Sequence, residues 1–404
     1  MIAVPQAGTF QGVSRRRFAG LIAASGLLSA CTGGFSPADL FSDSPQGAGT
    51  PQGGSEIGAG RIKVGLILPL SAGGNAGLAA ASMRNAAEMA LAEFNSQDLQ
   101  LLVKDDGGSV PGAQLAAQQA FAEGVELILG PLFAYSVAPV GQLARARNVP
   151  VIAFSTDANV AARGVYLLSF LPESDVERIV GYTLSQGKRS FAAAIPDNAY
   201  GTVVEAAFKQ SLARHGGRLV ALERYPLDRA LLAAAVRTVA QAAERADAIF
   251  VPDGGDSIAT VVQGLAANAA GSKRAQLLGT GIWEDPQIFS NAALDGAWYA
   301  GADVTGFRNF STRYRSRFNQ DPARTASLAY DAVALAAARA KTQGQQRFTE
   351  AVLTNSTGFT GIDGLFRFRS DGTNQRGLAV MRVSPSGAQI ISPAPKSFPT
   401  GSGI

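Results

Sequence analysis

The chain has 404 residues, 47% of them hydrophobic and 16% charged, which is enough for two globular α/β domains. Its formal net charge of +4 falls to about +1 once the arginines at positions 15, 16 and 17 in an acid-free stretch are set aside, so the charge does not favour a nucleic-acid partner. Cys31 is the only cysteine and His215 the only histidine. An internal disulfide is therefore excluded, and zinc sites and histidine-based triads need more of these residues.

The N-terminal stretch has the pattern of an export signal. Ser14–Phe18 (SRRRF) precedes a short apolar run, Ala19–Ala30, which is too short to span a bilayer as a helix of about 20 residues. The first segment resembles the twin-arginine export motif, and the general secretory route stays open. Leu28–Cys31 (LSAC) resembles the bacterial lipobox, so we expect Cys31 to carry the lipid; an ordinary secretory signal and an uncleaved anchor are the alternatives.

Residues 32–60 follow, rich in Gly, Ser, Pro and Gln, and predict a flexible tether. From Arg61 on, short apolar runs closed by Gly or Pro alternate with segments of helical spacing, which predicts strands of a parallel sheet with a helix after each. The expected strands are Ile62–Leu68, Leu99–Lys104, Glu126–Leu129, Val149–Phe154 and Gly164–Leu171, with helices at Ala79–Phe94, Pro111–Ala122 and Ser136–Arg147.

A break at Pro172 starts the alternation afresh. The second series has expected strands Ser190–Ile195, Arg218–Tyr225, Asp247–Val251 and Ala275–Leu278, with helices Glu177–Ser185, Tyr200–Arg214, Ala230–Ala243 and Ser257–Ala267. The tail adds helices Asn309–Phe318, Ser327–Lys341 and Arg347–Leu353. Asp363–Phe368 and Leu378–Ser384 flank a polar turn and predict a hairpin.

Seven short segments form a recognisable ordered set: Val64–Ser71 (VGLILPLS), Leu129–Pro131 (LGP), Val149–Thr156 (VPVIAFST), Pro196–Gly201 (PDNAYG), Leu278–Gly281 (LGTG), Ser327–Val333 (SLAYDAV) and Gly361–Gly372 (GIDGLFRFRSDG). In this order they resemble the type I periplasmic binding proteins, and among them the leucine-type amino-acid receptors of ABC importers. A sub-branch with the same fold is formed by lipoprotein activators of penicillin-binding proteins.

The resemblance implies an α/β fold of two doubly wound parallel-sheet lobes joined by a hinge that the chain crosses more than once. Residues 1–31 would be the signal and 32–60 the linker. Lobe 1 would hold 61–171 and about 303–345, lobe 2 would hold 172–302 and about 346–393, and 394–404 would be a tail. The cleft between the lobes would close on a small ligand.

The resemblance also implies ligand-binding positions. These are Ser136, Ser155, Thr156, Tyr200, Asp253, Gly254, Trp283 and Glu284. Ser155 and Thr156 match the loop that holds the ligand carboxylate, Tyr200 an aromatic wall, and Glu284 the acid that binds the ammonium. The sequence has Ala134 where these receptors usually have Ser, and Ser136 is the next hydroxyl.

Each of these positions also has a structural interpretation. Ser155 and Thr156 are typical helix caps, and an acid such as Asp253 complements a helix N-terminus. Tyr200 and Trp283 suit a packed core, and Glu284 before Asp285-Pro286 suits a solvated turn. The acid pair Asp105-Asp106 in a Gly-rich loop is expected to be solvated.

We expect a lipid-anchored periplasmic receptor that captures a small polar ligand, an amino acid or a relative, for ABC permease subunits. The alternative is a lipoprotein that uses the same fold to stimulate a cell-wall synthase. No nucleophile–base pair or metal cluster is visible, so we expect neither an enzyme nor a metal or other cofactor. Thr32 after Cys31, in place of Asp, favours the outer membrane over the inner one.

Overall fold

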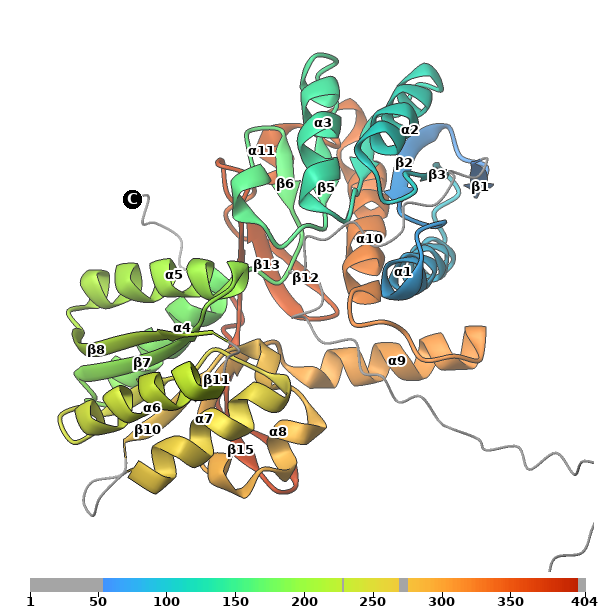
Figure 1. Cartoon of the computed structure of the whole chain (residues 1–404). Coiled ribbons are helices and arrows are strands. Elements are labelled where there is room, and N and C mark those ends of the chain that lie inside the picture. Colours follow the sequence, from blue (N-terminus) through green and yellow to red (C-terminus); the bar gives the residue numbers. More distant parts are fainter. Residues whose placement is uncertain (1–53, 227–228, 269–274, 399–404) are drawn as a thin grey trace, which may run out of the picture. The chain divides into compact units, whose positions relative to one another are not determined.

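The structure is a computed structural model, and it describes residues 54–226, 229–268 and 275–398 (Figure 1). Cys31, the signal, residues 32–53 of the linker and residues 399–404 of the tail lie outside this part of the chain. Within it, no helix has both the length and the apolar character that crossing a membrane requires.

The first sheet has the strand order β1-β3-β2-β4-β5-β6, and β2 to β6 pair in parallel. Its strands are β1 (Ser55–Ile57), β2 (Ile62–Leu68), β3 (Leu99–Asp105), β4 (Leu127–Leu129), β5 (Val151–Ala153) and β6 (Val165–Leu167). The helices between them are α1 (Gly74–Glu93), α2 (Val110–Ala122), α3 (Ala134–Arg145) and the short η2 (Ala158–Val160). The predicted alternation of strand and helix is therefore confirmed here.

Side chains of neighbouring residues on β2 point to opposite faces of this sheet. Leu66 and Leu68 belong to one buried cluster and Ile67 to another, as the two-residue period of a strand requires. The first cluster also includes residues of α1 and of α10 (Ala326–Thr342), the helix that packs against α1 (Figure 1). A sheet covered on both faces explains why its strands read as continuous apolar runs.

The linker prediction is wrong at its C-terminal end. Ser55–Ile57, expected to be part of a flexible tether, forms β1, which pairs antiparallel with β3 in the register Ser55↔Val103 and Ile57↔Leu101. The polar composition of the segment hid this strand, because an edge strand gains its backbone hydrogen bonds from a neighbour that is distant in sequence.

The second sheet has the order β16-β15-β11-β10-β9-β7-β8, parallel from β8 to β11 and antiparallel at β15 and β16. Its strands are β7 (Ser190–Pro196), β8 (Arg218–Tyr225), β9 (Ala248–Phe250), β10 (Gln276–Gly279), β11 (Trp298–Gly301), β15 (Ala379–Ser384) and β16 (Gly387–Ser392). The helices are α4 (Pro172–Ser185), α5 (Ala199–His215), α6 (Arg229–Ala243), α7 (Gly255–Asn268) and α8 (Pro286–Ser290), with η3 (Gly281–Trp283) and η4 (Ala292–Leu294).

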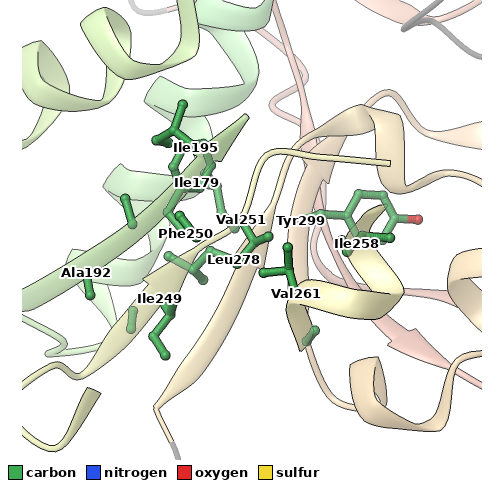
Figure 2. Close-up of a cluster of buried hydrophobic side chains, with 14 of the residues drawn as sticks. Ile179, Ala192, Ile195, Ile249, Phe250, Val251, Ile258, Val261, Leu278 and Tyr299 are labelled. Carbon is green, nitrogen blue, oxygen red and sulfur yellow. The ribbon is translucent and has the colours of Figure 1, made fainter. Parts of the chain in front are cut away.

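Figure 2 shows the apolar cluster of this second sheet, with Ile195, Phe250 and Leu278 from adjacent strands close to Ile179 of α4. All four side chains are buried. The chain passes between the elements packed with the first sheet and those of the second after β6, after β11 and again before β15, so the expectation of two parallel-dominated lobes joined by several crossings is confirmed.

The expected hairpin of Asp363–Phe368 with Leu378–Ser384 is wrong. The first of these strands pairs within a small third sheet in the order β12-β13-β14, and the second pairs with β11 and β16. The strands of the third sheet are β12 (Phe359–Gly361), β13 (Gly364–Phe368) and β14 (Asn374–Arg376). The remaining C-terminal helices are α9 (Val304–Phe318), η5 (Gly344–Gln346) and α11 (Glu350–Leu353).

The third sheet also corrects part of the expected lobe assignment. Phe359, Phe366 and Phe368 belong to the same buried cluster as Leu66 of the first sheet, whereas Val380 and its neighbours belong to the cluster of the second sheet. Residues 359–368, which lie within the range expected for lobe 2, therefore pack with the first sheet. The outer boundaries of the lobes stay a prediction.

Candidate functional site

One cavity of about 300 Å³ lies where the segment after β5 faces the start of α5, and we call it the Ser155 cavity. Its lining residues are Leu132, Phe133, Ala134, Phe154, Ser155, Thr156, Asp157, Asn159, Ala199, Thr202 and Val203. Ligands of open parallel sheets bind beyond the carboxyl ends of the strands, and the segment after β5 is at such an end. The structure therefore places Ser155 and Thr156 together at a cavity wall.

The backbone at this wall is held by its own side chains. The Ser155 hydroxyl accepts a hydrogen bond from the Asp157 N–H at 3.1 Å, and an Asp157 carboxylate oxygen accepts from the Asn159 N–H at 2.9 Å. The Ser155 side chain thus closes a local turn, whereas the residue that caps η2 is Asp157. Its hydroxyl hydrogen is not used by the bond to Asp157, so it can still donate to an acceptor in the cavity.

A second cavity of about 130 Å³ lies beside Tyr200 and is called the Arg376 cavity here. Its lining residues are Phe170, Leu171, Pro172, Ser174, Asp175, Tyr200, Gly281, Ile282, Glu284, Gly301, Ala302, Val304, Arg324, Arg376 and Leu378. They come from the crossing segments, from α4 and α5, and from the turn after β10. The predicted residues Tyr200 and Glu284 meet at this cavity.

Both of these predicted residues have hydroxyl partners. The hydroxyls of Tyr200 and Thr280 lie 2.6 Å apart, and the Tyr299 hydroxyl donates a hydrogen bond to the Glu284 carboxylate. Burial raises the pKa of the Tyr200 phenol, so this group stays protonated at neutral pH. Burial also raises the pKa of Glu284, so this side chain is protonated more easily than an exposed glutamate and then offers no negative charge to a ligand cation.

Asp175, in the first turn of α4, adds another acid to the Arg376 cavity. One of its carboxylate oxygens accepts a hydrogen bond from the Gly281 N–H at 2.8 Å. Burial raises the pKa of Asp175 to about 7, although this hydrogen bond and the charge of Arg376 oppose the rise.

Two arginines provide the positive charge at this cavity, and their partners differ. Arg324 donates to both carboxylate oxygens of Asp363, at 2.6 and 3.1 Å, and to the Ser327 hydroxyl at 3.1 Å. Arg376 donates through Nε to the Ser169 carbonyl at 2.8 Å, while neither of its terminal nitrogens has a hydrogen-bond partner among the described residues. Arg376 is only 5% exposed, so these terminal N–H groups are shielded from bulk water.

Four predicted ligand residues lie outside the lining of both cavities. Ser136 is fully buried on α3, and its hydroxyl has no partner among the described residues. Asp253, Gly254 and Trp283 are joined to one another: the Gly254 N–H donates to the Asp253 carboxylate at 2.8 Å, and the Trp283 indole N–H donates to the Asp253 carbonyl at 2.9 Å. Ligand contact by these four residues stays a prediction.

Two of these residues have a clear packing role. Trp283 is fully buried in the cluster of the second sheet, and the Asp253 carboxylate accepts a hydrogen bond from the Tyr225 hydroxyl at 2.5 Å. The packed-core interpretation considered from the sequence therefore accounts for the surroundings of Trp283. A fully enclosed indole presents no surface to a ligand.

The expected solvation of the Asp105-Asp106 pair is wrong. Asp106 is fully buried, and burial raises its pKa to about 7. Asp105 accepts hydrogen bonds from the N–H groups of Ser71 and Gly107, which makes it part of the turn after β3. Within residues 54–226, 229–268 and 275–398, no group of three or more His, Cys, Asp or Glu side chains is placed to hold a metal ion.

The sequence reasoning missed Asp175, Arg324 and Arg376. In the sequence, Asp175 is an acid at the predicted start of a helix. Acids are common at such positions because they interact favourably with the helix dipole, so nothing there indicated a ligand site. Arg324 and Arg376 stand in polar segments far apart in the chain, and no local spacing indicates that they meet at one cavity. The predicted polar turn covered residues 369–374, whereas its last residue, Asn374, begins β14 (Asn374–Arg376).

Comparison with solved structures identifies the class of fold. A protein of Rhodospirillum rubrum assigned to branched-chain amino acid ABC transport has 18% identity and a TM-score of 0.72, with 82% of this chain and 99% of that chain covered. An ABC transporter substrate-binding protein from Desulfitobacterium hafniense, in complex with Leu, has 16% identity, a TM-score of 0.60, and 82% and 99% coverage. A solute-binding protein of an R. palustris ABC transporter, in complex with benzoate, has 17% identity, a TM-score of 0.57, and 84% and 98% coverage.

These similarities show that the chain has the same fold as these solved proteins. The profile of the family described as "Periplasmic binding protein" matches residues 61–389, so the chain belongs to the periplasmic binding protein family. None of the curated protein sequences compared with the chain matches it. Family membership agrees with the expectation of a binding protein in place of an enzyme.

Proposed function

We propose that this protein is the solute receptor of an ABC importer and that it captures a small polar ligand, an amino acid or a relative, between its two lobes. The Arg376 cavity carries the proposal, because residues that pack with the first sheet and residues that pack with the second line the same space. Phe170 belongs to the first group, and Tyr200 and Ile282 to the second. A ligand bound there contacts both lobes, and these contacts stabilise their closed arrangement.

The similar structures point to the same ligand range. Leu and benzoate, named for two of those proteins, are both small and both carry a carboxylate next to an apolar body. The Ser155 and Arg376 cavities combine apolar walls with hydroxyl, carboxylate and guanidinium groups, which suits such molecules. ABC permease subunits are the partners that this role requires.

A thermal-shift experiment tests the receptor function. The mature protein is heated with each amino acid, with short peptides and with benzoate, at millimolar concentrations. A ligand at 100 times its dissociation constant adds about 2.7 kcal/mol to the free energy of unfolding, which gives a clear rise in Tm. If no compound in this panel raises the Tm, the receptor proposal is wrong and activation of a cell-wall synthase becomes the better explanation. Specific retention of such a synthase by the immobilised protein would support this alternative directly.

We also propose that Cys31 carries a lipid that holds the protein at the periplasmic side of the cell envelope, in the outer membrane. The support is the placement of the only cysteine at the end of the LSAC segment. Several acyl chains on one residue give stable anchoring. Metabolic labelling with an alkyne fatty acid should label the wild-type protein and not the Cys31→Ser variant, and fractionation should place the labelled form in outer membranes. Labelling that persists in the variant would contradict this site.

A further inference from the structure

Arg376 is a buried cation, and part of its guanidinium group has no hydrogen-bond partner among the described residues. Its Nε is used by Ser169, and its two terminal nitrogens face no acceptor among the described residues. The neighbouring Arg324 differs, because the carboxylate of Asp363 holds it by two hydrogen bonds. Burying a charge without a hydrogen-bonded partner is costly, so the free side of Arg376 is a strong place for an anionic group.

The acids near Arg376 are incomplete counter-charges. Burial lowers the pKa of Arg376, and the charges of Asp363, Asp331 and Asp175 oppose this effect, with that of Asp363 the largest. Burial raises the pKa of Asp331 and of Asp175 to about 7. Neither forms an ion pair with Arg376 within 4.0 Å in the described part of the chain. Asp363 is ionised and forms its ion pair with Arg324. At neutral pH, an additional carboxylate from a ligand would complete the charge balance.

The walls around the guanidinium define the rest of the ligand. The guanidinium carbon of Arg376 lies 4.6 Å from the ring centroid of Phe170, which holds the plane of the group against an aromatic surface. Leu171, Ile282 and Leu378 supply further apolar surface to the same cavity. Its volume of about 130 Å³ is close to the ~150 Å³ of an apolar cavity that holds benzene. A carboxylate joined to a compact apolar group therefore fits.

We propose that Arg376 binds the carboxylate of the ligand through its terminal nitrogens, so that the ligands of this receptor are small organic carboxylates. This inference rests on the receptor function proposed above. It differs from the sequence-based expectation, in which the hydroxyls of Ser155 and Thr156 hold the carboxylate. Arginine matches a carboxylate with parallel N–H···O bonds, and these charge-assisted bonds are stronger than those from neutral hydroxyls.

The experiment compares carboxylates with their neutral amides, which have nearly the same shape. The pairs are benzoate with benzamide, L-leucine with L-leucinamide, and 4-methylpentanoate with 4-methylpentanamide, and the measurement is the Kd by calorimetry. The wild-type protein should bind the carboxylate of at least one pair tighter than its amide by about tenfold or more, the range expected for a hydrogen bond to a charged group. Arg376→Gln should reduce this ratio to about twofold or less.

Arg382→Gln is the matched control. Arg382 lies on β15 in the same C-terminal region, is exposed, and bonds through its guanidinium to Gln389. This variant should keep the wild-type ratio. Because loss of the bond to Ser169 can itself disturb the fold, Arg376→Lys provides a second variant that keeps the charge and loses the paired donors. It should weaken carboxylate binding about fivefold or more and leave amide binding unchanged.

The outcomes separate the two proposals. If the wild-type protein binds a compound of the panel but binds no carboxylate more tightly than its amide, or if folded Arg376→Gln and Arg376→Lys keep the wild-type ratio, the assignment of Arg376 is wrong while the receptor function stands. If no member of any pair binds, and the wider panel of amino acids and peptides also gives no response, the receptor function itself is wrong and this inference falls with it.

Discussion

The carboxylate of Asp175 accepts a hydrogen bond from the backbone N–H of Gly281 at 2.8 Å, which joins the first turn of α4 to the turn after β10. Both residues line the Arg376 cavity. Burial raises the pKa of Asp175 from 3.8 to about 7, so its charged form is disfavoured in the folded protein relative to the unfolded chain. Stability should therefore depend on the protonation of this residue.

The direction of this dependence follows from proton binding. Between about pH 4 and pH 7 the folded protein holds a proton on Asp175 that the unfolded chain has lost, so the contribution of this group to stability falls as the pH rises through that range. Asp175→Asn keeps an oxygen for the Gly281 N–H and removes the charge. We expect the variant to lose less stability than the wild type between pH 4 and pH 8, as measured by urea unfolding. If the free energies of unfolding of the wild type and of Asp175→Asn change with pH in parallel, the interpretation of Asp175 as a buried acid is wrong.

Asp363 should show the opposite behaviour. Its side chain is fully buried, and although burial opposes its charge, Arg324 and other donors lower its pKa below 3.8. Its contribution to stability is present above the unfolded-state pKa and is lost as the pH falls through the lower folded-state value. At pH 7, Asp363→Asn should lower the free energy of unfolding by about 3 to 5 kcal/mol, because it leaves the charge of Arg324 without its partner.

The control for Asp363 is an exposed ion pair. Asp321 bonds to Arg315, and its side chain is 72% exposed. Asp321→Asn should change stability by about 1 kcal/mol or less, the usual range for surface pairs. Equal losses for Asp321→Asn and Asp363→Asn in urea unfolding would show that burial does not set the strength of the Arg324–Asp363 pair.

The apolar strands were predictable because both faces of each sheet are covered. A run such as Ile62–Leu68 is apolar at nearly every position, and it coincides with β2. The wrong pairing of Leu378–Ser384 with Asp363–Phe368 has a physical reason. Alternating apolar residues indicate that a segment is a strand, but they do not indicate which strand it pairs with. The side-chain amide of Asn374 donates to the carbonyls of Leu167 and Ser169, both at 2.8 Å, and these bonds fasten β14 to the crossing segment.

The candidate site was predictable only where local sequence carries the signal. Tyr200 and Glu284 follow the ends of parallel strands, where ligand residues are expected, and both line the Arg376 cavity. Arg376 comes from a polar segment whose position depends on contacts with residues about two hundred positions earlier, such as Ser169. The residues next to Arg376 in the sequence do not indicate such a long-range contact.

Ser155 and Thr156 allow a test of the Ser155 cavity. Both residues line it, and a polar group of the ligand other than the carboxylate assigned to Arg376 would lose a hydrogen-bond partner at this wall in Ser155→Ala or Thr156→Ala. We expect each variant to raise the Kd for the best ligand of the panel by about five- to tenfold, the value of one lost hydrogen bond. Thr312→Ala on the exposed face of α9 is the control and should leave the Kd unchanged. Wild-type affinity in both cavity variants would assign these hydroxyls to the local turn alone.

Gly279, near the end of β10, is the place where the second sheet has the least room for a side chain. A Cβ atom there would lie 2.1 to 2.5 Å from the ring atoms of Trp283, which is fully buried and hydrogen-bonded to Asp253. Such an overlap forces the indole or the strand to move, at a cost of about 1 to 3 kcal/mol. Gly279→Ala should lower the free energy of unfolding by that amount and shift the tryptophan emission.

Gly181, inside α4, provides a control, because its substitution by alanine is expected to raise the free energy of unfolding and not to lower it. A Cβ atom there would meet no atom within 4 Å, and alanine favours the helix by about 0.5 to 1 kcal/mol over glycine. Gly181→Ala should therefore stabilise the protein slightly and leave the emission of Trp283 unchanged. If Gly279→Ala were as stable as Gly181→Ala in urea unfolding, with unaltered emission, the close packing of Trp283 against β10 would be wrong.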